Sequence, residues 1–360
     1  MGISGFLAFL KKKVPEVIQY TSLSEFACHR VFIDISGTIY RYISACGKQD
    51  HRWIKAILYY LLMFRRHHVI PVPVFDGKPP KEKGDEIKER KEKRSFLQSR
   101  ISSLKAALED TKSPENQAIL AEELKRLDRR QERTSSLLTS KQTINSHDID
   151  SLQQVLQTLE RQHVVITDED LNLLKQIFTA FGISWLQSPS ESESFCAFLV
   201  RQNEGIAMVS SDSDSLAHLS PRVIFDISNT GVCTYIELKR LLDALEITQE
   251  ELIDYAILMG CDYNKHDKVN KLGPVNALKM IQQHHSIEQI PEDLLNKECL
   301  SYERCRELFQ PVFDAVVIRS ISIDWSEIEE HAAEWNLDAE FLRLWRTLSP
   351  PSVVPITFED

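Results

Sequence analysis

The segment SPSESESFCAFLVRQNEGIAMVSSDSDSL, residues 188–216, constrains the fold and chemistry of this chain more than any other segment. A predicted helix (194–201) is followed there by a predicted buried strand (206–210). Open α/β sheets carry their functional sites at the carboxyl ends of such strands. Two pairs of acids flank this unit: Glu191 with Glu193, and Asp212 with Asp214. Two unit charges about 4 Å apart repel by about 4 kcal/mol at an effective dielectric of 20, so the pattern indicates a site that holds cations.

A purely structural role for these acids is the alternative. Ser190 and Glu193 fit a capping box, in which each side chain bonds the other residue's backbone N–H at a helix N-terminus. Asp212 and Asp214 could simply favour the N-terminus of the next helix through its dipole. One cap per helix explains one acid and not two pairs. We therefore favour the metal site, provided that the pairs meet in space.

Composition places the chain among globular proteins. Of its 360 residues 42% are hydrophobic, and the strongly apolar run 56–64 is too short to span a bilayer, so we expect no membrane association. Seven cysteines without a CxxC spacing predict free thiols in a reducing, intracellular compartment. The net charge of −10 argues only weakly against nucleic acid, because bound ions would neutralise an acidic cluster and basic residues can gather locally.

Three further acids occupy positions where a local structural role does not fully explain them. The apolar run VFIDI carries Asp34 near its end, and the run VIPVPVF directly precedes Asp76. Asp-Gly alone is an ordinary turn signal, but two strands that both end on Asp exceed what turns require. Asp262 follows a predicted helix, Gln249–Met259, where a carboxylate faces the negative end of the helix dipole. A nearby cation would remove that conflict.

A basic stretch between residues 78 and 94 follows the second of these strands. Acids are interleaved with the bases, so a solvated helix face is the ordinary explanation. Lys83 and Arg90, however, are seven residues apart, which would place both on one side of a helix about 10.5 Å apart. Two cations on one face could together hold one phosphate group.

A helical hairpin is predicted next. Apolar residues recur at helical spacing over 97–108 and 120–127, and Ser113-Pro114 suits the start of the second helix. The polar stretch 139–150 is expected to return the chain to the core.

Near the other end, LGPVNALKMIQQHH predicts a Gly-Pro turn before a helix, whose backbone amides could hold a phosphate backbone. A plain helical hairpin explains that segment equally well.

These motifs occur in the order found in one nuclease family. MGISG, VFIDISGTIYRY, VPVFDGKPP, SPSESES, SDSDSL, MGCDYN and LGPVNALKMI resemble the motifs of the flap endonuclease branch of the XPG-type structure-specific 5′ nucleases. The resemblance implies an α/β fold: a mixed, mostly parallel central sheet flanked by helices (a PIN-like nuclease fold), with an inserted helical arch and a C-terminal helix-turn-helix-type DNA-binding region. Five parts are expected: an N-terminal nuclease region (1–96), the arch (97–150), an internal nuclease region (151–240), a helix-two-turn-helix duplex-binding region (241–325) and a C-terminal helical tail (326–360).

The resemblance also implies roles for individual acids and bases. Four acids match the ligands of one divalent metal ion in the family: Asp34, Asp76, Glu191 and Glu193. Three match the ligands of a second ion: Asp212, Asp214 and Asp262. Lys83 and Arg90 match arch residues that contact the scissile phosphate diester. An all-carboxylate site without His or Cys suits two Mg²⁺ ions, or Mn²⁺, rather than zinc.

Other matched residues imply contacts with nucleic acid. Tyr40, by default a core tyrosine, matches an aromatic residue on which the terminal base stacks, and Gly2 matches a small residue beside the site. Gly273 belongs to LGPVNA, which matches a turn that grips duplex DNA with a bound potassium ion. Lys271 stands where the family usually has glycine, and its charge could replace that of the ion.

The function implied is 5′-flap endonuclease and 5′-3′ exonuclease activity on DNA, in replication and repair. The expected partner is DNA with a 5′ flap, a nick or a free 5′ end, and the expected place is the nucleus or another site of DNA replication. No glutamine-led aromatic box occurs near the C-terminus, so binding to a sliding clamp is not predicted, and a monomer is expected. The alternatives are a related nuclease that degrades messenger RNA and a non-catalytic scaffold that displays the helical hairpin.

Overall fold

The structure is a computed structural model that describes residues 3, 5–48, 51–131, 146–264, 272–297 and 300–348. It divides into two compact units, which we describe separately: the first comprises residues 1–42, 49–86 and 167–360, and the second comprises 43–48 and 87–166. The second unit thus includes more residues than the arch predicted at 97–150. Among the described residues, no helix is long and apolar enough to cross a membrane.

In the described part of the first unit, seven strands form one sheet in the order β1-β7-β6-β5-β2-β3-β4. The five strands from β6 to β4 are parallel, and β7 and β1 join antiparallel at one edge. This mixed, mostly parallel sheet confirms the predicted fold class. The strands are β1 (Ile18–Ser22), β2 (Arg30–Asp34), β3 (Ile70–Phe75), β4 (Leu186–Gln187), β5 (Ala207–Val209), β6 (Arg222–Ile227) and β7 (Val232–Glu237).

Alternation of side chains along the central strands decides which face each polar residue meets. Successive residues of a strand point to opposite faces, so a residue two positions after a buried core residue lies on the same face. Three such pairs occur at the ends of adjacent parallel strands: Phe32 with Asp34, Val74 with Asp76, and Met208 with Ser210. The apolar member of each pair packs in the same core as helix α8 (Ser192–Arg201). The polar members are therefore directed toward the N-terminus of α8.

Helices surround this sheet in the first unit. Helix α7 (Asp168–Ala180) starts with a capping box between Thr167 and Asp170, and α11 (Gln249–Met259) has the predicted bounds. The others are α1 (Phe6–Lys13), α2 (Ile35–Cys46), α3 (Arg52–Arg66), α9 (Asp214–Ala217), α10 (Leu238–Leu245), α12 (Pro274–His284), α13 (Tyr302–Phe309), α14 (Trp325–His331) and α15 (Ala339–Thr347), with short 3-10 turns η1 (Pro15–Val17), η2 (Leu23–Phe26), η4 (Lys81–Lys83) and η5 (Ile287–Gln289).

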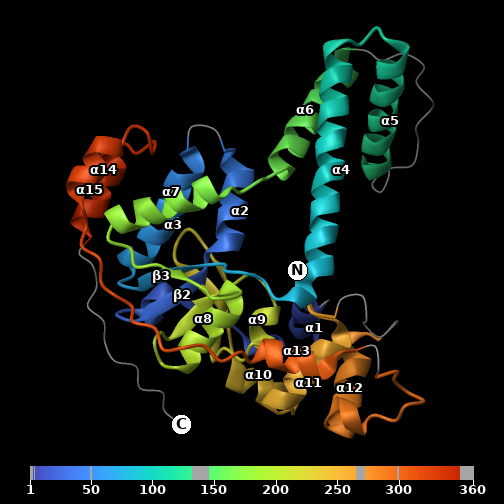
Figure 1. Cartoon of the computed structure of the whole chain (residues 1–360), viewed down its shortest axis with the longest axis vertical. Helices are drawn as coiled ribbons and strands as arrows, with labels where there is room; N and C mark the ends of the chain where they lie inside the picture. Colours follow the sequence, from blue (N-terminus) through green and yellow to red (C-terminus); the bar gives the residue numbers. More distant parts are fainter. Residues whose placement is uncertain are drawn as a thin grey trace. The chain divides into compact units, whose positions relative to one another are not determined.

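The second unit is built from long helices: α4 (Gly84–Glu109), α5 (Pro114–Gln131) and α6 (Ser146–Gln162) (Figure 1). Leucine and isoleucine side chains from all three form its core: Ile101, Leu104, Leu120, Leu152 and Leu159. The predicted start of a helix at Pro114 is confirmed. The predicted polar return at 139–150 lies partly outside the described residues, and from Ser146 onward it is helical instead. Leu152 and Leu159 lie on one helix face, and burying that face outweighs the polar character of the first turn.

Candidate metal centre

Asp34 and Asp76, at the ends of neighbouring strands, are bridged by a serine at the start of α8. The Ser192 hydroxyl lies 2.8 Å from Asp34 Oδ1 and 2.7 Å from Asp76 Oδ1. The backbone N–H of Ser192 donates to the same Asp76 oxygen at 2.9 Å, and the Ser36 hydroxyl donates to the other. One hydroxyl proton can serve only one acceptor at a time, so the two carboxylates compete for Ser192.

This crowding changes the acidity of Asp34. Burial, and then repulsion from the Asp76 carboxylate, raise the pKa of Asp34 to about 7. The Ser192 hydroxyl and the backbone N–H of Ser36, which donates to Asp34 Oδ1 at 3.2 Å, oppose that rise. Asp34 is therefore close to half-protonated at neutral pH unless a cation approaches it.

Glu193, Asp212 and Asp214 form the neighbouring part of the cluster. The Ser210 hydroxyl donates to Glu193 Oε1 at 2.9 Å and accepts from the Asp212 backbone N–H at 3.1 Å. Burial, together with repulsion from Asp212 and Asp214, raises the pKa of Glu193 well above its usual value. Asp214 is 3% exposed, and its Oδ1 atom has no hydrogen-bond partner among the described residues. Burial and the Asp212 and Asp262 carboxylates raise the pKa of Asp214 as well.

Lys83 places a positive charge among these acids. Its ammonium group contacts Glu191 Oε1 and lies 3.2 Å from Asp262 Oδ2. Burial opposes this charge, but the Glu191 and Asp262 carboxylates outweigh burial and raise the pKa of Lys83 above its usual value. The hydroxyl of Tyr263 donates to the other Glu191 oxygen at 2.7 Å. Both oxygens of Glu191 are therefore already engaged.

The donor set suits hard cations, although its direct ligands are not assembled in advance. Within the described residues, no three His, Cys, Asp or Glu side chains form a ready-made metal-binding group. The unpartnered, buried Oδ1 of Asp214 and the raised pKa values of Asp34 and Glu193 nevertheless indicate negative charge that Lys83 does not fully compensate. Oxygen-only ligands that bind in part through water are what Mg²⁺ prefers. The cluster therefore fits divalent cations.

The structure brings all seven predicted acids to one region of the first unit. Several of these carboxylates are near enough to repel one another. The pairs are Asp34 with Asp76, Asp34 with Asp212, Glu193 with Asp214, and Asp214 with Asp262. Lys83 connects Glu191 to the same group. The capping box considered as the alternative does not form: Glu191 and not Ser190 is the N-cap of α8, without a side-chain cap bond, and the Glu193 carboxylate accepts from Ser210.

Two expectations about the remaining predicted residues are also wrong. Lys83 and Arg90 do not share a helix face, because Lys83 lies in the turn η4 before α4, and Arg90 belongs to the second unit. Tyr40 is 43% exposed on α2, because its neighbours Ile39 and Ile43 form the buried face and leave Tyr40 outside it, so it is not a core tyrosine.

Of the two glycines and the lysine predicted to bind nucleic acid, only Gly273 is among the residues that the structure describes. Gly2 and Lys271 lie outside the described residues. Gly273 is the N-cap of α12, and an added Cβ there would have no described atom within 4 Å.

Sequence reasoning missed the side chains that orient the acids. Ser192 and Ser210 could have been suspected, because each lies beside paired acids, in SESES and SSDSD. Tyr263 directly follows Asp262, but nothing in the sequence shows that it reaches Glu191. His218 is 1% exposed, and burial lowers its pKa to about 3, so the ring is neutral at physiological pH.

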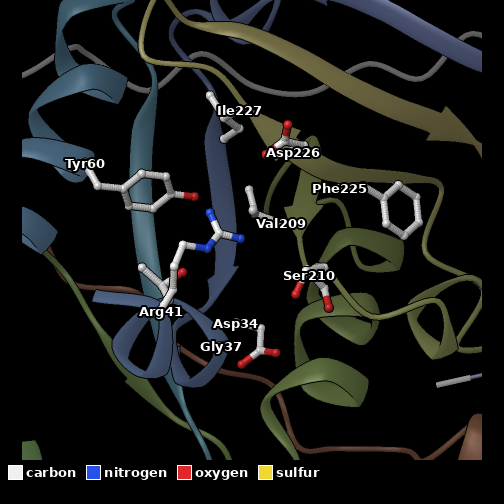
Figure 2. Close-up of a pocket in the computed structure, with 11 residues that line it drawn as sticks. Asp34, Gly37, Arg41, Tyr60, Val209, Ser210, Phe225, Asp226 and Ile227 are labelled. Carbon is white, nitrogen blue, oxygen red and sulfur yellow. The ribbon is translucent and has the colours of Figure 1, made fainter. Parts of the chain in front are cut away.

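A pocket adjoins the cluster at the carboxyl edge of the sheet. Figure 2 shows the Arg41 side chain extending into it between Tyr60 and Asp226, with Asp34 and Ser210 at one end. Arg41 is exposed and follows Tyr40 on α2. A basic side chain that sequence reasoning did not single out thus lies next to the acidic edge.

Two family models match the chain. The XPG N-terminal domain matches residues 1–96, and the XPG I-region matches residues 182–262. The chain is 26% identical over 356 residues to flap endonuclease 1 of Lachancea thermotolerans, covering 92% of this chain and 79% of that protein. It is 27% identical over 351 residues to flap endonuclease 1 of Glycine max, covering 92% of this chain and 80% of that protein.

Solved structures share the fold. The catalytic core of Rad2 in complex with DNA substrate matches with a TM-score of 0.64 and 15% identity, covering 97% of this chain and 100% of that one. Flap endonuclease-1 from Methanococcus jannaschii matches with a TM-score of 0.59 and 20% identity, covering 92% of this chain and 94% of that one. The two domain matches and the flap endonuclease relatives therefore support the predicted resemblance to the flap endonuclease branch of the XPG-type nucleases.

Proposed function

We propose that this chain is a structure-specific 5′ nuclease that hydrolyses DNA phosphodiesters at single-strand/duplex junctions. It would act as a 5′-flap endonuclease and a 5′-3′ exonuclease in DNA replication and repair. The observation that carries this proposal is the convergence of seven carboxylates from separate segments, with the half-buried Lys83 among them. The relatives named flap endonuclease support the class of substrate.

Two Mg²⁺ ions, or Mn²⁺ in their place, fit this cluster. Four acids would hold one ion, in part through water: Asp34, Asp76, Glu191 and Glu193. Three would hold the other: Asp212, Asp214 and Asp262. Such a pair of ions makes water nucleophilic at neutral pH and stabilises the leaving oxygen of a phosphodiester.

The chain's own groups would position the substrate. Lys83 keeps its charge at physiological pH, and its ammonium group would contact the scissile phosphate, as would Arg90 on α4. Tyr40 exposes its ring on α2, where an unpaired terminal base could stack on it. The backbone at Gly273, the N-cap of α12, would receive a phosphate of the duplex, with Lys271 adding positive charge.

A labelled 5′-flap DNA in Mg²⁺ tests the proposal. The wild-type protein should cut it near the junction, and Asp214→Asn should bind the flap without cutting it. Asp243→Asn is the matched control, because Asp243 is an exposed acid on α10 away from the cluster. Cutting by the wild type in chelator, or undiminished cutting by Asp214→Asn, would refute the mechanism.

The same assay distinguishes the other candidate functions. A flap made of RNA with the same sequence should be cut more slowly than the DNA flap, and a preference for RNA would redirect the function to RNA degradation. Binding to both flaps without cutting either, under every divalent-metal condition, would favour a scaffold.

A further inference from the structure

Tyr263 and Lys83 hold the two oxygens of one acid, Glu191. Its hydroxyl donates to Glu191 Oε2 at 2.7 Å, while the Lys83 ammonium contacts Glu191 Oε1. The two partners come from different elements, since Lys83 ends η4 and Tyr263 lies just beyond α11. The Lys83 ammonium also lies 5.3 Å from the centroid of the Tyr263 ring. Glu191 is thus held at both oxygens by a cation and a phenol that contact each other.

The position of the phenol is itself fixed by packing. Tyr263 is 7% exposed, and the ring of Phe309 packs against it at a centroid distance of 5.2 Å. His218 Nδ1 lies 3.0 Å from the Phe309 carbonyl oxygen. A carbonyl oxygen only accepts, so Nδ1 carries the ring proton and Nε2 is an acceptor.

The direction of the Tyr263 hydroxyl follows from its two acceptors. His218 Nε2 is 3.4 Å from the hydroxyl oxygen, and the Glu191 oxygen is 0.7 Å closer, at 2.7 Å. The single proton of the phenol therefore goes to the carboxylate, because a charged acceptor at short distance makes the stronger bond. This arrangement gives Glu191 a fixed, neutral donor that does not depend on Lys83.

We propose that Tyr263 is a positioning residue of the metal centre, which fixes the orientation of the Glu191 carboxylate for cation binding. This inference rests on the proposed function, since it assigns Glu191 to a metal. A carboxylate oxygen retains a further lone pair after it accepts one hydrogen bond, so Tyr263 and a cation can share Glu191. Loss of a hydrogen bond to a metal-binding side chain typically costs about 10- to 100-fold in metal affinity.

The test is Mn²⁺ binding to the protein without DNA, followed by the electron paramagnetic resonance signal of free Mn²⁺. Tyr263→Phe removes only the hydroxyl and should weaken the affinity of the site about tenfold. Tyr255→Phe is the matched control: Tyr255 is fully buried in α11, and its hydroxyl has no hydrogen-bond partner among the described residues. That variant should bind Mn²⁺ like the wild type, and urea unfolding should show that both variants are folded.

A double-mutant cycle shows whether Tyr263 acts through Glu191. Adding Tyr263→Phe to Glu191→Ala should cause no further loss of Mn²⁺ affinity. The inference is overturned if the tenfold loss persists without Glu191, or if Tyr263→Phe binds Mn²⁺ like Tyr255→Phe. If Tyr263→Phe binds Mn²⁺ like Tyr255→Phe while the wild type binds Mn²⁺ and cuts flaps, only the role of Tyr263 is overturned and the proposed function stands. If the wild type neither binds Mn²⁺ nor cuts flaps, the role of Tyr263 and the proposed function are both overturned.

Discussion

Asp214→Asn should make the protein more stable without metal and less stable with it. Asp214 is 3% exposed, its Oδ1 atom has no partner among the described residues, and Asp212 and Asp262 repel it. A buried polar atom without a partner costs about 1–3 kcal/mol, and more when it is charged. Asparagine leaves a polar atom in place but removes the charge that Asp212 and Asp262 repel, so we expect the free energy of unfolding in chelator at pH 8 to rise by about 1–3 kcal/mol, less than the repulsion of about 4 kcal/mol between two charges about 4 Å apart at an effective dielectric of 20.

Metal should reverse this order. At a Mg²⁺ concentration about 1,000 times the dissociation constant, a site that binds only the folded state stabilises it by about 4.1 kcal/mol, which exceeds the gain expected from the substitution. The variant should lose most of that gain, because it removes a proposed ligand. Urea unfolding of the wild type, Asp214→Asn and the control Asp243→Asn, each in chelator and in Mg²⁺, measures both effects. An Asp214→Asn protein that is less stable than the wild type in chelator would refute the reasoning.

Three other perturbations give separate expectations. Since the folded protein raises the pKa of Asp34 from 3.8 to about 7, it binds that proton more tightly than the unfolded chain does, and the stability of the metal-free protein should fall as pH rises from 4 to 7. Asp34 lowers the free energy of unfolding over this range by at most about 4 kcal/mol, and by less because the side chain is partly exposed to solvent. Urea unfolding in chelator should show this pH dependence for the wild type and not for Asp34→Asn. Gly77→Ala should destabilise the protein by at least about 3 kcal/mol in the same assay, because the added Cβ would lie 2.1 Å from the Ser188 carbonyl oxygen; a loss below about 1 kcal/mol would contradict this. Arg306→Ala should lower the free energy of unfolding by about 3–5 kcal/mol, because the guanidinium of Arg306 contacts both oxygens of the Asp254 carboxylate, which is only 2% exposed. A variant that unfolds thermally near the wild-type temperature would contradict this expectation.

The positions of the acids could be predicted because the signals are local. Asp34 and Asp76 each end a run whose apolar residues mark a buried strand, and parallel strands bring such ends together. The strands β1 and β7 were not predicted, because their sequences IQYTS and VCTYIE are only partly buried in the outer part of the sheet. Propensity gives little guidance there, since pairing with neighbouring strands stabilises them.

The contacts that organise the acids could not be predicted, because they join distant segments. Ser192 bridges Asp34 and Asp76 only once α8 packs across two strands, and Tyr263 meets Glu191 across 72 positions of the chain. The alternative capping box between Ser190 and Glu193 does not form, and the Ser210 hydroxyl at the end of β5 donates to the Glu193 carboxylate instead. Tertiary hydrogen bonds thus replaced the local ones that the sequence favours.

The number of Mn²⁺ ions bound per chain tests the central claim most directly, because it measures the acidic cluster without reference to any substrate. The wild-type protein at pH 8 should bind about two ions, and Asp214→Asn should bind fewer. A wild-type protein that binds no Mn²⁺ at millimolar concentration would contradict the account.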